Sequence, residues 1–533
     1  MWFLNRFDQQ SAAYNVPMAV RLTGELDVAA LRAAIGDVVA RHEVLRTVYP
    51  EVPESDSPNA LSGPVQVILP VARAIPELEI RTVTPAEIEA AVVELTSTIF
   101  DVTSEVPLRV ALFEVETGND SAAREYVVAM VVHHISGDGS SVAPLTRDLM
   151  TAYATRAAGE APNWPPLPVQ YADYSLWQRE LLGSEDDPES LAAKQIGYWQ
   201  TALAELPDQL DLPSDRPRPA VQSFAGGKVP VRIDAETHRA LVDLARSEGA
   251  TLFMVVHTAL AVLLARLSGT EDIAIGTPVA GRGEAVLDDM IGMFVNTLVF
   301  RSRVDGGEAF TELLARQRET DIQAFANADV PFERLVEVLN PVRSTARHPL
   351  FQVGLSFQNL ALATLDLPGL TVSGVDFDTQ LSQFDLHLIV SDRYDESGAP
   401  TGIEGVLTYA SDLFDPETVE GFVGRFARLL SGIVAAPRTA VGELSLLGDA
   451  ERAGIVLGRN ATGFATDRSA TLPSLLDATV AARADAVALV GPDGAAVTYA
   501  ELSERVNRLA RHLVSLGVGA ESRVALALRR SVD

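Results

Sequence analysis

Two adjacent histidines occupy the segment with the clearest capacity for chemistry, His133-His134-Ile135-Ser136-Gly137-Asp138-Gly139. A histidine that titrates near neutrality can take a proton from an amine or hydroxyl nucleophile, and a carboxylate paired with an arginine can hold the loop that aims it. Adjacent histidines lack the four-residue separation with which one helix face presents two zinc ligands. The pattern favours acid–base or orienting work over metal binding. Two hydrogen-bonded core histidines that close a hairpin are the alternative interpretation.

Motifs for other kinds of catalysis do not accompany this segment. No serine stands in Gly-x-Ser-x-Gly, and Gly226-Gly227-Lys228 lacks the upstream glycine and the following Ser or Thr of a phosphate loop. The chain has no cysteine, which excludes thiolate nucleophiles, disulfides and cysteine-ligated metals. Direct transfer between two bound substrates, assisted by a histidine, is what remains.

The elements around the histidines can be predicted from the local pattern. Two β-rich runs, Leu108–Val115 and Glu125–Val132, predict a hairpin whose second strand stops at His133. The segment Ser141–Tyr153 then predicts a helix. Residues 133–139 therefore lie in a strand-to-helix loop, a place where proteins often display functional groups.

Length and charge narrow the classes of function. The 533 residues predict three or four domains, and 42 basic against 72 acidic residues give a net charge of −30. That charge disfavours binding to nucleic acid or anionic lipid. The apolar run Leu252–Leu267 falls short of the ~20 residues of a bilayer span, so it predicts a buried helix. With no export signal at the start, we expect a cytoplasmic protein without a membrane anchor.

Composition shifts suggest where the chain divides. Proline-rich segments at 162–168 and 213–219 bracket a break between two halves, and the weakly periodic residues 448–471 suggest a linker. Beyond the linker, a capping box from Thr498 to Glu501 predicts a helix, and Arg523–Leu528 predicts a strand.

The segment His133–Gly139 resembles the His-His-x-x-x-Asp-Gly signature of condensation domains of nonribosomal peptide synthetases, a superfamily with a chloramphenicol-acetyltransferase-like fold. Further segments resemble the other motifs of that family in its order along the chain: Met1–Leu4, Arg41–Thr47, Tyr171–Gln178, Ile291–Arg301, Asn327–Glu333 and Arg343–Leu350. The segment Val497–Leu502 resembles an element near the start of adenylation domains. The ATP-handling loops of those domains and the serine site of a carrier domain have no counterpart, so the chain looks like a fragment of a longer synthetase.

The resemblance implies a role for each residue of the signature. His134 is the catalytic histidine, as a general base or as a group that orients the amine and stabilises charge, and His133 is secondary. Asp138 is structural and salt-bridged to an arginine, with Arg301 as first candidate and Arg46 as second. Gly139 lets the substrate approach the backbone. For Asn296 and Trp177, loop support and packing are favoured over contact with the substrate.

The resemblance also implies an architecture of two chloramphenicol-acetyltransferase-like α/β lobes around a central cleft. We expect the first lobe at 1–175, the second at 176–447, a linker at 448–471 and an incomplete adenylation start at 472–533. The implied reaction joins a donor acyl or peptidyl thioester to an acceptor aminoacyl thioester. Both arrive on the 4'-phosphopantetheine arms of carrier proteins, and no cofactor is bound by the chain itself.

Alternatives within and outside this superfamily differ in recognisable ways. Heterocyclisation domains replace the signature by an Asp-x-x-x-x-Asp form, which the intact His133-His134 argues against. Epimerisation domains keep the histidines but do not lead into an adenylation domain, and the segment Phe294–Thr297 resembles the type that accepts an L-configured donor. An inactive docking or scaffold fragment of a synthetase is the alternative of a different class.

Overall fold

The strands predicted before the histidines form the centre of a first sheet. In the computed structural model, β7 (Leu108–Val115) and β8 (Glu125–His133) pair antiparallel, which confirms the predicted hairpin. The sheet has five strands in the order β13-β1-β8-β7-β6, and its other members are β1 (Asn15–Gly24), β6 (Leu78–Val83) and β13 (Leu370–Gly374). The structure describes residues 2, 5, 12, 14–52, 63–116, 124–358, 367, 369–375, 377–378, 380–465, 467–492, 494–528 and 531.

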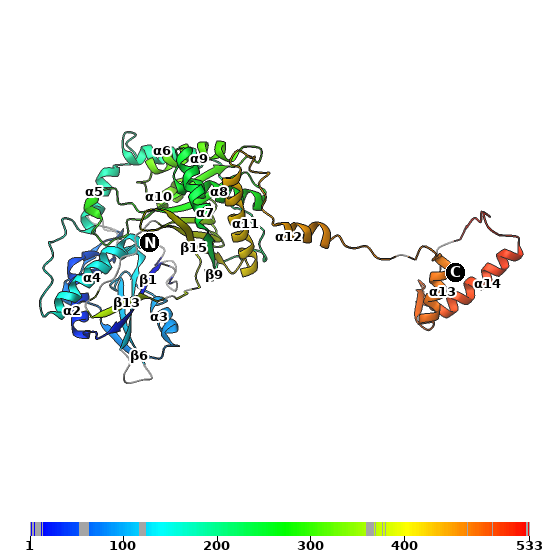
Figure 1. Cartoon of the computed structure of the whole chain (residues 1–533), viewed down its shortest axis with the longest axis horizontal. Coiled ribbons are helices and arrows are strands. Elements are labelled where there is room, and N and C mark those ends of the chain that lie inside the picture. Colours follow the sequence, from blue (N-terminus) through cyan, green and yellow to red (C-terminus); the bar gives the residue numbers. More distant parts are fainter. Residues whose placement is uncertain are drawn as a thin grey trace. The chain divides into compact units, whose positions relative to one another are not determined.

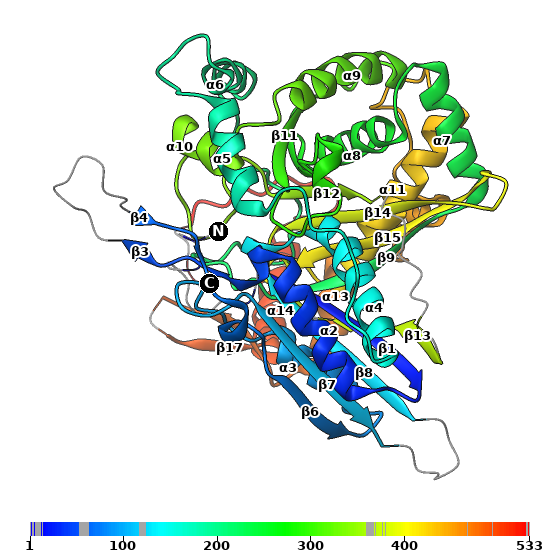
Figure 2. The ribbon, with the colours of Figure 1, turned by 90° about the vertical axis from the view of Figure 1, so that its left-hand side faces the viewer.

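Helices cover both faces of this sheet, which explains why β8 is buried along nearly its whole length. Helices α2 (Val28–Arg41) and α4 (Val142–Ala157) pack on one face, and α3 (Ile88–Thr96) packs on the other (Figure 2). The Asp27 carboxylate accepts a hydrogen bond from the Ala30 N–H, so this residue caps α2. Short pieces β2 (Thr47–Val48), β3 (Glu51–Val52), β4 (Gly63–Pro64) and β5 (Val67–Ile68) follow α2.

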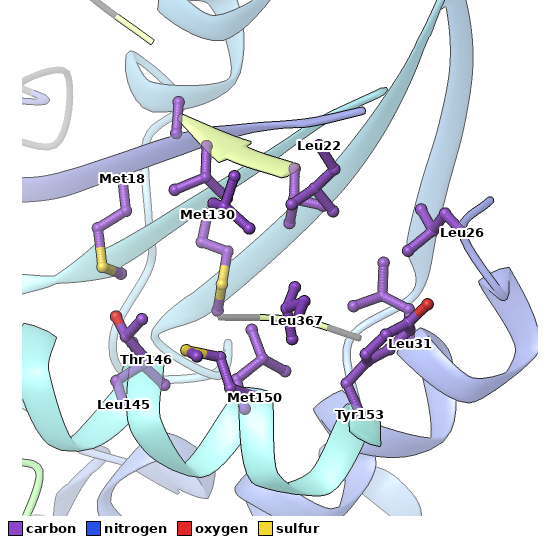
Figure 3. Close-up of a pocket in the computed structure, with 15 residues that line it drawn as sticks. Met18, Leu22, Leu26, Leu31, Met130, Leu145, Thr146, Met150, Tyr153 and Leu367 are labelled. Atoms are coloured by element: carbon purple, nitrogen blue, oxygen red, sulfur yellow. The ribbon is translucent and has the colours of Figure 1, made fainter. Parts of the chain in front are cut away.

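A small apolar cavity of about 70 Å³ lies inside the first lobe, between the sheet and α4. Figure 3 shows the thioether side chains of Met18, Met130 and Met150 around it, together with Leu367 from far along the chain. Because its walls are almost wholly apolar, this space offers no partners to polar ligands. It is a packing gap of the core.

The second sheet has six strands in the order β11-β10-β12-β14-β15-β9. Its members are β9 (Gly226–Ile233), β10 (Asp272–Val279), β11 (Asn296–Arg303), β12 (Val353–Phe357), β14 (Leu386–Tyr394) and β15 (Pro400–Ala410). One face is covered by α7 (Ala235–Ser247), α8 (Leu252–Ser268), α9 (Phe310–Ala326) and α11 (Pro416–Ala435) (Figure 1). The predicted buried helix is α8, capped by the Thr251 side chain. Helices α5 (Tyr171–Leu182), α6 (Leu191–Ala202) and α10 (Phe332–Leu339) complete the lobe.

One strand that follows the second sheet in the chain joins the first sheet. Strand β13 follows β12 of the second sheet in the chain, yet it pairs with β1 of the first sheet from Val20↔Gly374 to Gly24↔Leu370. A division of the chain near residue 175 therefore does not separate the two sheets completely. Both sheets belong to one compact unit, Met1–Leu447.

Residues Gly448–Asp533 form a second compact unit. It contains α12 (Asp449–Ala453), a π-helical turn (Gly454–Gly458), α13 (Leu472–Arg483), β16 (Val487–Val490), β17 (Ala496–Thr498) and α14 (Tyr499–Ser515). The capping box from Thr498 to Glu501 is confirmed. The predicted strand Arg523–Leu528 is wrong, because these exposed residues pair with no described strand and a strand needs a neighbour for its backbone groups. Part of the expected linker is helical.

No single helix in the described ranges is both long and apolar enough to cross a membrane, and α7 with α8 reaches that length only across a bend of 105°. Within the same ranges, no group of three His, Asp or Glu side chains is placed to hold a metal ion.

Candidate active site

His133 is the last residue of β8, and its side chain points into the first lobe. Only 4% of the residue is exposed, the ring lies edge-on against Phe100 with centroids 6.0 Å apart, and Nδ1 accepts a hydrogen bond from the Ile135 N–H at 3.1 Å. Burial lowers the pKa of His133 to about 4. The ring is therefore neutral near pH 7 and holds the turn that follows it.

His134 begins a short 3-10 turn, His134–Ser136, immediately after the strand. Its N–H donates a hydrogen bond to the Tyr14 carbonyl at 2.7 Å, which fixes the backbone against β1. The side chain is half-buried, and no other described residue hydrogen-bonds to Nδ1. Burial lowers the pKa of His134, although the charge of Asp138 opposes the shift. The ring is therefore neutral near pH 7, which is the form that can accept a proton, while Nδ1 itself is shielded from solvent.

Asp138 joins the histidine loop to the second lobe. Its Oδ1 accepts hydrogen bonds from the Ser141 N–H at 2.9 Å and hydroxyl at 2.8 Å, and its Oδ2 accepts from the Phe294 N–H at 2.9 Å and the Val295 N–H at 3.2 Å. The Ser141 hydroxyl also accepts a hydrogen bond from the Gly292 N–H at 3.1 Å. Asp138 is 2% exposed. With its lone pairs committed, this carboxylate positions the loop and is not available to a substrate.

The arginine that pairs with Asp138 is Arg282. Its Nη2 lies 3.4 Å from Asp138 Oδ1 and donates to the Ser141 hydroxyl at 3.1 Å. Nη1 donates to the Met290 carbonyl at 2.9 Å, and the guanidinium lies 4.1 Å from the centroid of the Phe294 ring. The expected pairing of Asp138 with an arginine is confirmed, while both arginines named from the sequence are wrong.

Arg301 and Arg46 lie elsewhere. Arg301 forms a two-pronged ion pair with Asp272 on the neighbouring strand β10, with Nε at 2.8 Å and Nη2 at 2.6 Å. Arg46 donates to Glu43 at 2.9 Å and to the Leu69 carbonyl at 2.7 Å. In both cases the strand or turn directs the side chain away from Asp138.

Asn296 has hydrogen bonds that support a loop, whereas Trp177 is exposed. The Asn296 amide donates to the carbonyls of Ala328 and Val330 at 2.8 and 2.9 Å, and its oxygen accepts from the Phe332 N–H at 3.0 Å, so it holds the loop before α10. Trp177 on α5 is 44% exposed. The hydrogen-bond partners of Asn296 and the ring partner of Trp177, Tyr174, are residues other than His134.

Gly139 is exposed, and a Cβ built on it would meet nothing within 4 Å. A side chain here would fit the protein but would project into open space beside the loop. Of the first motif, Met1, Phe3 and Leu4 lie outside the described residues, and Trp2 donates to the Tyr49 carbonyl at 2.7 Å.

Three residues that hold the histidine loop are not predicted as site residues from the sequence: Arg282, Ser141 and Tyr14. Arg282 is 144 residues from Asp138, and no spacing rule marks such a pair. The spacing of Ser141 could have indicated its role, because a serine three residues after an aspartate is typical of a helix N-terminal cap. Tyr14 contributes a carbonyl, which side-chain patterns do not reveal.

A cavity of about 340 Å³ lies between the lobes. It is lined on one side by Asn15 and Pro17 of β1 and on the other by His387 and Ile389 of β14 and Thr408 of β15. Asn15 is the register partner of His133, so the cavity begins beside the histidine loop.

Comparisons with known proteins identify the family of the chain. The family model "Condensation domain" matches residues 1–456, and the model "AMP-binding enzyme" matches residues 476–533. The chain is 46% identical over 531 residues to the probable non-canonical nonribosomal peptide synthetase CymA of Salinispora arenicola. The match covers 100% of this chain and 7% of that protein. It is 45% identical over 533 residues to a dimodular nonribosomal peptide synthase of Bacillus subtilis, covering 100% of this chain and 22% of that protein. The chain thus spans less than a quarter of the length of either relative.

Solved structures show the same fold. The X-domain from teicoplanin biosynthesis matches with a TM-score of 0.76 at 34% identity, over 84% of this chain and 95% of that one. The four-domain nonribosomal peptide synthetase holo-AB3403 matches with a TM-score of 0.79 at 25% identity, over 97% of this chain and 38% of that one. The chain belongs to the condensation-domain family, the amide-forming enzymes of nonribosomal peptide synthetases with a chloramphenicol-acetyltransferase-like fold, and it continues into the start of an AMP-binding enzyme domain.

Proposed function

We propose that this chain joins a donor acyl or peptidyl thioester to an acceptor aminoacyl thioester, with His134 as the catalytic residue. The observation that carries the proposal is the neutral, half-buried imidazole of His134 at the end of β8. Its backbone is fixed by the Tyr14 carbonyl, and its loop is fixed by the hydrogen bonds of Asp138. Such a group is preorganised to take or hold a proton without first losing one of its own.

The reaction balances without any co-reactant. The acceptor amine attacks the donor thioester carbonyl, a C–N bond forms, and the C–S bond breaks. The amine gives up one proton and the departing thiolate gains one, so the donor arm leaves as a free thiol. His134 either carries that proton or orients the amine and stabilises the charge that develops. The new amide remains on the acceptor arm.

The substrates arrive on carrier proteins, whose 4'-phosphopantetheine arms reach the site between the lobes. The relatives are synthetases several times longer than this chain, which supports a supply of both substrates by neighbouring parts of such an assembly. The donor is L-configured, as the segment Phe294–Thr297 suggests by its resemblance to that type of condensation domain. The reaction takes place in the cytoplasm.

A docking role is the second candidate. One solved relative of similar fold is an X-domain seen in complex with OxyB, at 35% identity and a TM-score of 0.76. A condensation-type fold can therefore serve in a protein complex, and the chain would then need neither a reactive His134 nor loaded carriers.

The experiment that separates the two candidates mixes the purified chain with a donor carrier and an acceptor carrier, each loaded with an aminoacyl thioester. Intact-protein mass spectrometry would then detect a dipeptide on the acceptor carrier. We expect this product with the parental chain and with His512→Ala, since His512 is exposed on α14, and its loss with His134→Ala. Equal product yield from His134→Ala would remove His134 from the mechanism. No amide with several donor and acceptor pairs would favour docking.

A further inference from the structure

The wall of the interlobe cavity formed by the second sheet has a polar character that the reaction above does not use. Along β14 and β15, Leu386, Leu388 and Leu407 pack into the core of the second lobe, whereas His387 and Thr408 line the cavity. His387 and Thr408 are register partners on these antiparallel strands, so their side chains lie next to each other on one face.

The His387 ring is held in place from three sides. Nε2 lies 2.8 Å from the Ser356 hydroxyl, and Phe384 packs edge-on with ring centroids 5.2 Å apart. The third side is Gly354, its register partner on β12, where a Cβ would come within 2.8 Å of His387 Cδ2. The missing side chain at Gly354 therefore makes room for an imidazole of fixed orientation.

The remaining hydrogen-bonding capacity faces the cavity. Among the described residues, the side-chain hydrogen bond of His387 is made by Nε2, which leaves Nδ1 and the Thr408 hydroxyl for a ligand. Burial lowers the pKa of His387 to about 4, which leaves the ring neutral near pH 7. None of the described residues that line the cavity is an aspartate, glutamate, lysine or arginine.

The cavity is lined by a register partner of His133 and is large enough for a substrate side chain. Asn15 lines it and pairs in register with His133, and the residue before Asn15 holds His134 through its carbonyl. Its volume of about 340 Å³ is far above the ~10–15 Å³ that one water requires. The cavity wall at Asn15 is therefore one residue along the chain from the carbonyl that holds His134.

We propose that His387 and Thr408 form a subsite that receives an uncharged, hydrogen-bonding side chain of one of the two carrier-bound substrates. This inference rests on the proposed function and names the feature of the substrate that the site selects. An apolar side chain would leave the two polar groups without partners, and a charged one would be buried without a counter-charge. Both would bind less well than an uncharged polar side chain of the same size.

The test uses the full chain and pantetheine thioesters of near-isosteric amino acids, glutamine with methionine and tyrosine with phenylalanine. In one arm these are N-acetylated donors for glycyl-pantetheine, and in the other they are acceptors for acetylglycyl-pantetheine. We expect a preference for the polar member of about tenfold or more in kcat/KM in one arm, the effect of about one hydrogen bond. The arm in which it appears identifies the substrate.

Two variants on different strands remove the polar groups while keeping the shape: His387→Phe and Thr408→Val. We expect each to reduce the preference several-fold, whereas the matched control His512→Phe, at an exposed position of α14, keeps it. Amide formation with no preference in either arm, or an unchanged preference in both variants, would overturn the subsite while leaving the proposed function intact.

Absence of amide both from every pantetheine pair and from the loaded carriers would contradict the proposed function, and binding then decides the subsite. Unreactive pantetheine thioethers that carry the glutamine or the methionine side chain can be titrated into the chain by calorimetry. Tighter binding of the glutamine compound, lost in His387→Phe and Thr408→Val, supports the subsite. Equal dissociation constants for the two compounds would overturn it.

Discussion

The carboxylate of Asp138 accepts a hydrogen bond from the backbone N–H of Phe294 at 2.9 Å, across 156 residues of sequence. Asp138 lies in the loop after β8 of the first lobe, and Phe294 lies just before β11 of the second. The loop that carries His134 is thereby tied to both lobes at once. A small shift of one lobe against the other would move the imidazole relative to a substrate.

We expect Asp138→Ala to destabilise the protein. The substitution leaves the buried Arg282 guanidinium without its carboxylate and the Phe294 and Val295 N–H groups without acceptors, at a cost of about 3 to 5 kcal/mol in the free energy of unfolding. Urea denaturation would measure it. The control Asp272→Ala removes the more exposed partner of Arg301 and should cost less. An inactive Asp138→Ala protein of parental stability would instead indicate a carboxylate that acts on the substrate.

In contrast, His134→Ala should lower the rate of amide formation and leave the stability of the protein nearly unchanged. We expect a loss of about 10²- to 10⁴-fold in the rate of amide formation, because one imidazole is removed from the reaction centre. The free energy of unfolding should change little, since no other described residue hydrogen-bonds to Nδ1. Single-turnover kinetics with loaded carriers and a melting curve on the same sample would check both. A large drop in melting temperature would show that the histidine serves the fold.

Acidification should destabilise the folded chain through its buried histidines. The His348 ring lies among Phe332, Phe351 and Phe384, and burial lowers its pKa to about 4. Between pH ~6.5 and ~4 the unfolded chain therefore binds a proton that the folded chain does not, so stability falls as the pH falls through this window.

The variant His348→Phe removes one of these proton-binding groups and keeps an aromatic ring at the position. We expect its loss of stability between pH 7 and pH 5 to be smaller than the parental loss by about 1 to 2 kcal/mol. Denaturation at a series of pH values would give the slopes for the two proteins. Parallel profiles for His348→Phe and the parent would contradict the assignment.

Asn296→Ala should weaken the loop before α10. The change leaves the carbonyls of Ala328 and Val330 and the Phe332 N–H without the amide that binds them, so we expect a loss of about 1 to 3 kcal/mol in the free energy of unfolding. Trp177→Ala, at a partly exposed ring, should cost less. Chemical denaturation of the two proteins side by side is the measurement, and the reverse order would be inconsistent with the loop-supporting role.

Local features of this chain could be predicted and long-range ones could not. The hairpin before His133 and the cap at Asp27 follow from periodicity and from side chains three residues apart. The partner of Asp138 is set by how the two lobes pack, which the position of Arg301 at the end of a motif does not reveal. In the structure Arg301 lies on β11 opposite Ala274 of β10, which brings it to Asp272. Arg523–Leu528 has a strand-like composition but no described neighbour to pair with.

The position of β13 in the first sheet affects how the protein can be divided into stable fragments. A fragment ending near residue 175 would lack Leu370–Gly374, so the backbone groups of β1 from Val20 to Gly24 that now pair with it would become an open edge. Exposed edges of this kind recruit further strands and promote self-association. We therefore expect such a fragment to self-associate, and a soluble version of the first lobe would need residues 370–374 supplied in trans or by a redesigned connection.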